Sequence, residues 1–364
     1  MTPLRLLLRA CAMSAVCTAL IGCASLSRVE GSSWNVWSHS LQQARGHLQL
    51  IASARHVQDV LDDPQTDPTL RQRLRLSQAI RDFAVTELQL PDGASYRRFA
   101  RLDRTAVVWN VVAAPEFSLS LKPWCLPVAG CVGYLGFFDQ AQAQAMAATL
   151  REQGWEVSVY PVVAYSTLGL TDWLGGDPLL DTFIHWPEAS LARLIFHEMA
   201  HQVVYAPGDT SFNESFATAV ERLGWARWQQ RRGMPAMPED TRAQQWVDLI
   251  RLARDDLTHL YASSLELSVK RQQKRARLDR LREDYQQLRQ SWNGPAPGYD
   301  AWMSSVNNAS LGAQGIYHDA VDSFVRIFER CERHFPCFYA RVRDLAALPA
   351  AQRQQMLHDT GSRQ

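Results

Sequence analysis

The stretch His197-Glu198-Met199-Ala200-His201 lies inside an apolar run, residues 189–204, whose spacing predicts a helix. Two histidines four positions apart lie on one face of a helix, so both rings can reach one cation. Imidazole nitrogens suit zinc, and Glu198 would lie beside the metal as the general base for a water molecule. The stretch therefore predicts a catalytic Zn²⁺ centre. The alternative is a buried helix whose histidines are satisfied by hydrogen bonds.

A catalytic zinc site needs a third protein ligand and one open position. Glu214 is the leading candidate, because it follows His201 after a short link and opens a second predicted helix, residues 213–230. Glu221 is the alternative ligand. It shares the helix face with Glu214 but lies two turns further on, about 10 Å along the axis. Glu214 could also be an acid that only favours the helix dipole.

Several other motifs accompany these two helices. They are Phe196-His197-Glu198-Met199-Ala200-His201-Gln202, Asp209-Thr210-Ser211-Phe212-Asn213-Glu214-Ser215-Phe216-Ala217-Thr218-Ala219-Val220-Glu221, Val128-Ala129-Gly130-Cys131-Val132, Ala164-Tyr165-Ser166-Thr167-Leu168-Gly169, Asp177-Pro178-Leu179-Leu180 and Asn307-Asn308-Ala309. Through them the chain resembles the bacterial putative aminopeptidase family, a group of zinc-peptidase-like lipoproteins. The resemblance implies hydrolysis of peptide bonds from the N-terminus of a substrate. The chain departs from the expected family spacing by an insertion, residues 170–176.

The leading interpretation is a zinc-dependent peptidase, with an aminopeptidase favoured by the resemblance. Zinc would be held by His197, His201 and Glu214. Glu198 would take a proton from the attacking water and return it to the leaving amine.

Two candidates for stabilising the oxyanion stand near the C-terminal end of the chain. A zinc peptidase commonly needs a Tyr or His donor opposite the base, and Tyr317 and His318 are polar residues in an otherwise apolar region. The alternative is a tyrosine of the core and a histidine that caps a helix.

Two other functions stay open. One is a zinc endopeptidase, because an aminopeptidase must hold the substrate's α-amine with acids, and the sequence does not place any. The nearby acids are Asp172, Asp177, Asp181 and Glu188. The other is a non-catalytic envelope lipoprotein that binds peptide or cell-wall material, although such a protein has no chemical need for Glu198.

Residues 1–22 are expected to be a bacterial lipoprotein signal peptide. Arg5 and Arg9 provide a positive n-region before a short apolar segment, and Leu20-Ile21-Gly22-Cys23-Ala24 looks like a lipobox. Cleavage before Cys23 would leave a lipidated cysteine, with palmitate as an expected acyl chain. The alternatives are a plain secretory signal and a membrane anchor. We therefore expect a lipid-anchored protein of the bacterial cell envelope that faces the periplasm, most simply from the outer membrane.

Four cysteines remain after the signal peptide and the lipidated residue. They form two close pairs, Cys125 with Cys131 and Cys331 with Cys337, each six positions apart. An even number of cysteines in an oxidising compartment indicates disulfides, and local pairing is the simplest of three connectivities. The alternative is buried free thiols.

The rest of the chain is expected to be a tether, residues 23–40, and one zinc-peptidase-like domain, residues 41–364. The predicted fold class is α+β and mainly helical, with a zincin-like core. Strands predicted at residues 106–113 and 157–164 indicate a small sheet beside the H-E-x-x-H helix.

Residues 241–292 contain neither Gly nor Pro and predict a long helical arm, either an antiparallel pair or one bent helix. Its charged middle is interpreted as a solvated face, and the alternative is contact with a partner or with lipid headgroups near residues 270–277. The whole chain is 46% hydrophobic, enough for a sizeable core, and its net charge of +1 argues against a nucleic-acid partner. The expected partners are a peptide or protein substrate and the membrane that holds the lipid.

Overall fold

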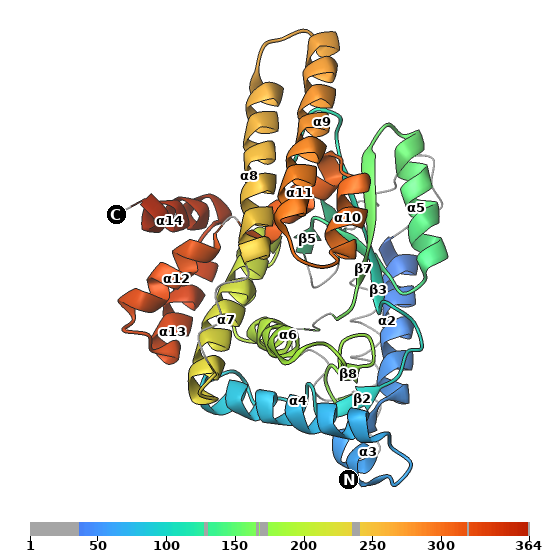
Figure 1. The fold of residues 1–364 in the computed structure, drawn as a ribbon, viewed down its shortest axis with the longest axis vertical. Helices are drawn as coiled ribbons and strands as arrows, with labels where there is room; N and C mark the ends of the chain where they lie inside the picture. The colour runs from blue at the N-terminus through green and yellow to red at the C-terminus, as the bar shows by residue number, and fades with distance from the viewer. Residues whose placement is uncertain are drawn as a thin grey trace, which may run out of the picture. The chain divides into compact units, whose positions relative to one another are not determined.

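The computed structural model describes residues 36–126, 130–164, 167, 174–234, 241–318 and 320–362. The chain divides into two compact units, residues 1–45 and residues 46–364. The described strands and both helices with candidate ligands belong to the second unit. The elements are α2 (Val36–Ser53), β1 (Arg55–His56), α3 (Val57–Asp62), α4 (Pro68–Thr86), β2 (Arg98–Ala100), β3 (Val108–Ala114), β4 (Trp124–Leu126), β5 (Gly130–Val132), β6 (Leu135–Phe137), α5 (Gln140–Glu152), β7 (Glu156–Val162), β8 (Leu179–Leu180), α6 (Glu188–Ala200), α7 (Thr210–Arg231), α8 (Thr241–Ala262), α9 (Leu267–Ser291), α10 (Pro297–Ser304), α11 (Asn308–His318), α12 (Val321–Arg330), α13 (Phe335–Ala346) and α14 (Ala350–Ser362) (Figure 1).

The fold is α+β and mainly helical, as predicted. The described strands form three small sheets with the orders β1-β2-β8, β6-β3-β7 and β4-β5. In the second sheet, β3 pairs antiparallel with both neighbours. All seven residues of β3 are buried, which requires cover on both faces of the sheet, and the helices α5 and α11 both pack on β3 and β7.

The largest hydrophobic core surrounds α6 and α7 and includes side chains of α4, α12 and α13. The two central helices approach closely at Gly224 of α7. A Cβ atom added there would lie 2.8 Å from the ring of Phe196 on α6 and 2.7 Å from Leu88. Phe196 itself is fully buried, and burying such a ring stabilises the fold by about 1.5–3 kcal/mol. The missing side chain therefore lets the two helices approach closely beside Phe196, the residue before His197.

The helical arm is an antiparallel pair and not one bent helix, because residues 263–266 separate α8 from α9 (Figure 1). The two helices share a core of their own, in which Trp246 and Leu257 of α8 pack with Leu281 and Tyr285 of α9. This second core explains how the arm stays ordered away from the main core.

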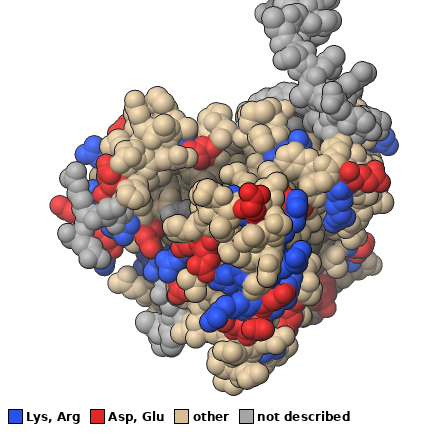
Figure 2. Space-filling view, turned by 90° about the horizontal axis from the view of Figure 1, so that it is seen from above, with Lys and Arg blue, Asp and Glu red and all other residues tan. Residues whose placement is uncertain are grey.

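Most of the basic side chains at residues 270–277 of α9 contact other groups of the protein. Their contacts are Lys270 with the carbonyl oxygen of Tyr261, Arg271 with Glu116, Lys274 with Glu156, and Arg277 with Asp256. Figure 2 shows Lys and Arg interspersed with Asp and Glu on the face seen from above. These contacts favour a structural role for the stretch over the alternative of a free basic patch for headgroups.

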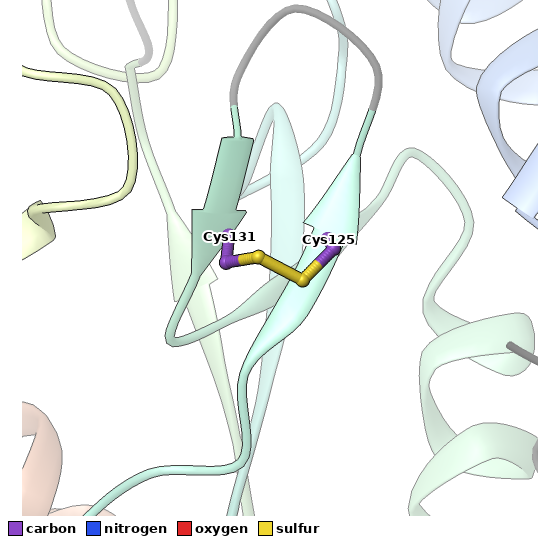
Figure 3. Close-up of a disulfide and its surroundings, with 2 residues drawn as sticks. All are labelled: Cys125 and Cys131. Carbon is purple, nitrogen blue, oxygen red and sulfur yellow. A yellow bond between two sulfur atoms is a disulfide. The ribbon is translucent and has the colours of Figure 1, made fainter.

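Both locally paired disulfides are formed. Cys125 and Cys131 face one another in the register of β4 and β5, with their Cα atoms 3.8 Å apart (Figure 3). Cys331 and Cys337 join the end of α12 to the start of α13, with Cα atoms 5.7 Å apart. The first disulfide therefore joins two antiparallel strands, β4 and β5, at directly paired positions.

The N-terminal predictions reach the described residues only in part. The signal peptide, residues 1–22, and Cys23 lie outside them. Helix α2 begins at Val36, within the segment predicted as a tether, residues 23–40. Among the described helices, none combines the length and the apolar character that a membrane span requires.

Candidate metal centre

Helix α6 carries the H-E-x-x-H stretch at its C-terminal end. Its buried face, which includes Phe196, Met199 and Ala200, packs in the main core. His197 and Glu198 stand in the last turn, and His201 is the residue that ends the helix, still with helical backbone angles. The i, i+4 spacing therefore survives to the last residue, and both imidazoles leave the same side of α6.

The link between the two helices is held by side chains at the start of α7. Asp209 caps α7, because its carboxylate accepts a hydrogen bond of 3.0 Å from the backbone N–H of Phe212. The buried amide of Asn213 pairs with both backbone groups of Ala206, accepting from its N–H at 2.8 Å and donating to its C=O at 2.9 Å. The residue before Glu214 thus ties α7 to the link that follows His201.

His197, His201 and Glu214 come together as one group. One ligand atom from each lies within 4.8 Å of the others. Oε2 of Glu214 is 3.2 Å from Nε2 of His197 and 3.7 Å from Nε2 of His201. Two imidazoles and a carboxylate from two different helices are a donor set typical of catalytic zinc sites, so these side chains fit the metal that the sequence implies.

Glu221 lies on the other side of His197. Its carboxylate is 3.3 Å from Nδ1 of that ring and 3.9 Å from the guanidinium of Arg193. A carboxylate at the far nitrogen of a ligating histidine fixes the tautomer and the orientation of the ring. The two glutamates, which the sequence offered as rival third ligands, therefore occupy different positions: Glu214 contacts both imidazoles, and Glu221 contacts one from behind.

Burial and charge shift the pKa values of this cluster in different directions. Burial opposes protonation of His197, but hydrogen bonds to Glu214 and Glu221 outweigh it and raise the pKa of His197 well above its usual value. Burial lowers the pKa of His201 to about 4 and raises the pKa of Glu198 to about 7. Burial also acts to raise the pKa of Glu214, but His201 and His197 outweigh it and hold that pKa below its usual value.

These shifts describe a buried site with more carboxylates than cations. The ring of His197 lies between Glu214 and Glu221, and its raised pKa favours the protonated form, whose positive charge offsets the negative charges of the two carboxylates. A divalent cation held by the same donors would supply that positive charge, and metal binding in general releases such protons. The electrostatics of the cluster therefore fit a cation at this place.

Two tyrosines near the cluster were not singled out from the sequence. Burial raises the pKa of Tyr134 strongly, and Glu214, Tyr205 and Glu198 contribute to the shift. Burial is the main cause that raises the pKa of Tyr205, and the charge of Glu214 adds to the shift. Tyr205 stands in the short link after the H-E-x-x-H stretch, and this position could have identified it. Tyr134 precedes β6, far upstream, and nothing in its local sequence connects it with the site.

The oxyanion candidates chosen from the sequence, Tyr317 and His318, stand at the end of α11. Their side chains lie outside the described residues. The backbone of α11 packs against α7, β3 and β7. Tyr317 and His318 belong to the last turn of α11, whose range is Asn308–His318.

The acids considered for holding a substrate amine are engaged within the protein where the structure describes them. Asp177 accepts hydrogen bonds of 2.8 Å and 2.9 Å from the hydroxyl and the backbone N–H of Thr167. Asp181 accepts from two backbone N–H groups, and Glu188 accepts from an indole N–H. Asp172 lies outside the described residues.

Comparison with known proteins identifies one family. A family model described as "Putative aminopeptidase" matches residues 38–357, a range that contains both ligand-bearing helices. No curated protein and no solved structure matches the chain.

Proposed function

Because the chain belongs to the family described as putative aminopeptidases, we propose that it is a zinc-dependent peptidase that removes residues from the N-terminus of peptides. The observation that carries this proposal is the group of His197, His201 and Glu214, with one ligand atom each inside 4.8 Å, beside the buried Glu198.

In the proposed mechanism, His197, His201 and Glu214 would hold the metal. Zinc at this place would supply Lewis acidity towards a carbonyl oxygen and would make water more acidic. Glu221 keeps Nδ1 of His197 hydrogen-bonded, so that Nε2 stays turned towards Glu214.

Glu198 is the proposed general base. The residue is only 9% exposed and follows His197 directly on α6, yet it does not belong to the three-residue donor group. A carboxylate in this position accepts the proton of the attacking water and delivers it to the nitrogen of the leaving amine. Its burial keeps bulk water from competing for that proton.

Tyr134 is the proposed donor to the oxyanion. Its electrostatic surroundings contain both Glu214 and Glu198, and a tyrosine hydroxyl is ordinarily protonated at neutral pH. A neutral O–H donor near the developing negative charge lowers the barrier to attack on the carbonyl. Tyr205, which has Glu214 in its surroundings, is the second donor in this proposal.

A zinc endopeptidase is the second candidate. It is favoured by the engagement of Asp177, Asp181 and Glu188 with groups of the protein itself, because an aminopeptidase needs an acid for the α-amine. Cleavage products separate the two functions: a peptide library incubated with the purified chain should lose single N-terminal residues. Cleavage inside the peptides would instead identify an endopeptidase.

The same digest tests the metal. A chelator should abolish cleavage and added zinc should restore it. An absence of cleavage under all conditions would favour the non-catalytic alternative, a lipoprotein that binds peptide or cell-wall material.

We also propose that the protein works in the bacterial envelope, attached through lipid on Cys23 and facing the periplasm. The two disulfides support an oxidising compartment. Mass spectrometry of the N-terminal peptide from membrane fractions should find acylated Cys23, and a soluble mature protein with a different N-terminus would contradict the proposal.

A further inference from the structure

A buried ion pair joins the C-terminal region of the chain to the first turn of α7. Nε of Arg353, on α14, lies 2.9 Å from Oδ2 of Asp209, and the two side chains are only 5% and 10% exposed. The guanidinium also lies over the ring of Phe212, 5.0 Å from its centroid. Two contacts of one arginine thus meet at the residues that begin the helix of Glu214.

Arg353 is held in place from the other side. Its Nη1 donates to the carbonyl oxygens of Ala346 and Leu348, at 2.8 Å and 3.1 Å, where α13 ends. The guanidinium therefore bridges the C-terminus of one helix, where cations are favoured, and the N-terminal cap of another, where anions are favoured. Its burial, its planar donors and these fixed acceptors leave the side chain little freedom.

Asp209 performs two tasks with its two oxygens. Oδ1 caps α7 by accepting from the N–H of Phe212, and Oδ2 accepts from Arg353. Asn213 ties the next turn to the link, and Glu214 follows at once. The position of the Glu214 carboxylate therefore depends on an N-terminal turn that Arg353 holds from the C-terminal helices.

We propose that Arg353 and Asp209 are positioning residues for the metal ligand Glu214, so that the C-terminal helix α14 contributes to metal affinity without touching the metal. The proposal rests on the proposed function, since it requires the metal centre. Without the ion pair, the first turn of α7 frays, and metal binding must also order it. Removal of partners that orient ligands typically weakens metal binding by about 10- to 100-fold.

The test measures zinc affinity of the purified full chain, by competition with a chromophoric chelator, for wild type, Arg353→Met, Arg353→Lys and Asp209→Asn. Asparagine keeps the capping oxygen but removes the charge. The matched control is Asp139→Ala, because Asp139 caps α5 in the same way, with hydrogen bonds to the N–H groups of Ala141 and Gln142, and α5 carries no ligand.

We expect Arg353→Met and Asp209→Asn each to weaken zinc binding about 10- to 100-fold, and the double variant to be no worse than either, because the pair acts as one unit. Arg353→Lys should recover part of the loss. Asp139→Ala should lower the melting temperature of the metal-free protein while leaving zinc affinity unchanged. The visible spectrum of bound Co²⁺ should change in Arg353→Met, because it reports the ligand set.

Wild-type zinc affinity in both Arg353→Met and Asp209→Asn would overturn the inference while leaving the metal centre intact. If Arg353→Met does not fold, Asp209→Asn alone decides, since its cap remains. A wild-type chain that binds no zinc would overturn the proposed function itself, and the inference with it.

Discussion

Two helix pairs of this protein differ in where their charged side chains lie. In α6 and α7, the carboxylates of Glu198, Glu214 and Glu221 gather around two imidazoles inside the main core. In the arm formed by α8 and α9, carboxylates meet guanidinium groups at the surface, as in the pair of Asp248 and Arg251. The first pair gathers three carboxylates where water is scarce, whereas an ion pair such as that of Asp248 and Arg251 on the second lies in solvent.

This difference indicates a binding site in α6 and α7 and a structural role for α8 and α9. Exposed ion pairs contribute little to stability, because solvent screens them and the side chains lose freedom. Buried carboxylates are costly unless a cation or hydrogen bonds balance them. Several buried carboxylates around two histidines therefore favour a site that binds a cation. The donors His197, His201 and Glu214 fit a divalent metal ion. Breaking charges in the two pairs should accordingly affect different quantities.

The largest effect is expected for the ligand on α7. Glu214→Ala should remove stoichiometric zinc, because two imidazoles alone make an incomplete catalytic site. Metal analysis of the purified variant measures this. Glu221→Ala should still contain zinc at saturating concentrations, and the reverse result would show that Glu221 is the ligand.

A smaller loss is expected behind His197. Glu221→Gln keeps the shape but removes the charge facing Nδ1, and such changes typically weaken zinc affinity by about 10- to 100-fold. Arg193→Gln should have less effect, since its contact with Glu221 is 3.9 Å long and partly exposed. Chelator competition compares the two. Equal affinities in wild type and Glu221→Gln would contradict the assigned role.

A substitution in the arm should change the free energy of unfolding and leave the affinity for zinc unchanged. Lys274 is buried and contacts both Glu156 and the carbonyl oxygen of Glu116. Lys274→Met should lower the free energy of unfolding by about 1–2 kcal/mol, because it removes a charged hydrogen-bond donor from a part-buried site. Urea denaturation measures the change. Zinc affinity should stay at the wild-type value, and a parallel loss would mean that the arm supports the site.

The smallest effect is expected on the surface of α8. Arg251→Gln removes an exposed i, i+3 pair with Asp248 and should change the free energy of unfolding by less than about 0.5 kcal/mol. A larger loss, by the same urea measurement, would contradict the view that the arm's surface charges are solvated scaffolding.

The donor group could be predicted from sequence because helix geometry is local. The i, i+4 spacing places His197 and His201 on one face whatever surrounds them, and a short link limits where Glu214 can stand. The strands of the small sheet could likewise be predicted from their residue pattern. The helical arm could be predicted from the absence of Gly and Pro.

The rest depends on contacts between distant segments. The charges of Glu214 and Glu198 act on Tyr134, which is far from both in sequence, and Arg353 reaches Asp209 from the far end of the chain. Glu221 lies on the same face of α7 as Glu214, so its sequence position is also compatible with a metal ligand. Only the orientation of the His197 ring shows that the Glu221 carboxylate faces Nδ1. No local pattern records such tertiary placement.

The central claim is that Glu198 does chemistry beside a metal that it does not hold. Zinc content and peptide hydrolysis, measured together on wild type and Glu198→Gln, test it most directly. We expect one zinc per chain in both proteins and a loss of hydrolysis of at least about 10²- to 10⁴-fold in the variant, because an amide cannot accept the water's proton. Loss of zinc from Glu198→Gln, or hydrolysis at the wild-type rate, would contradict the account.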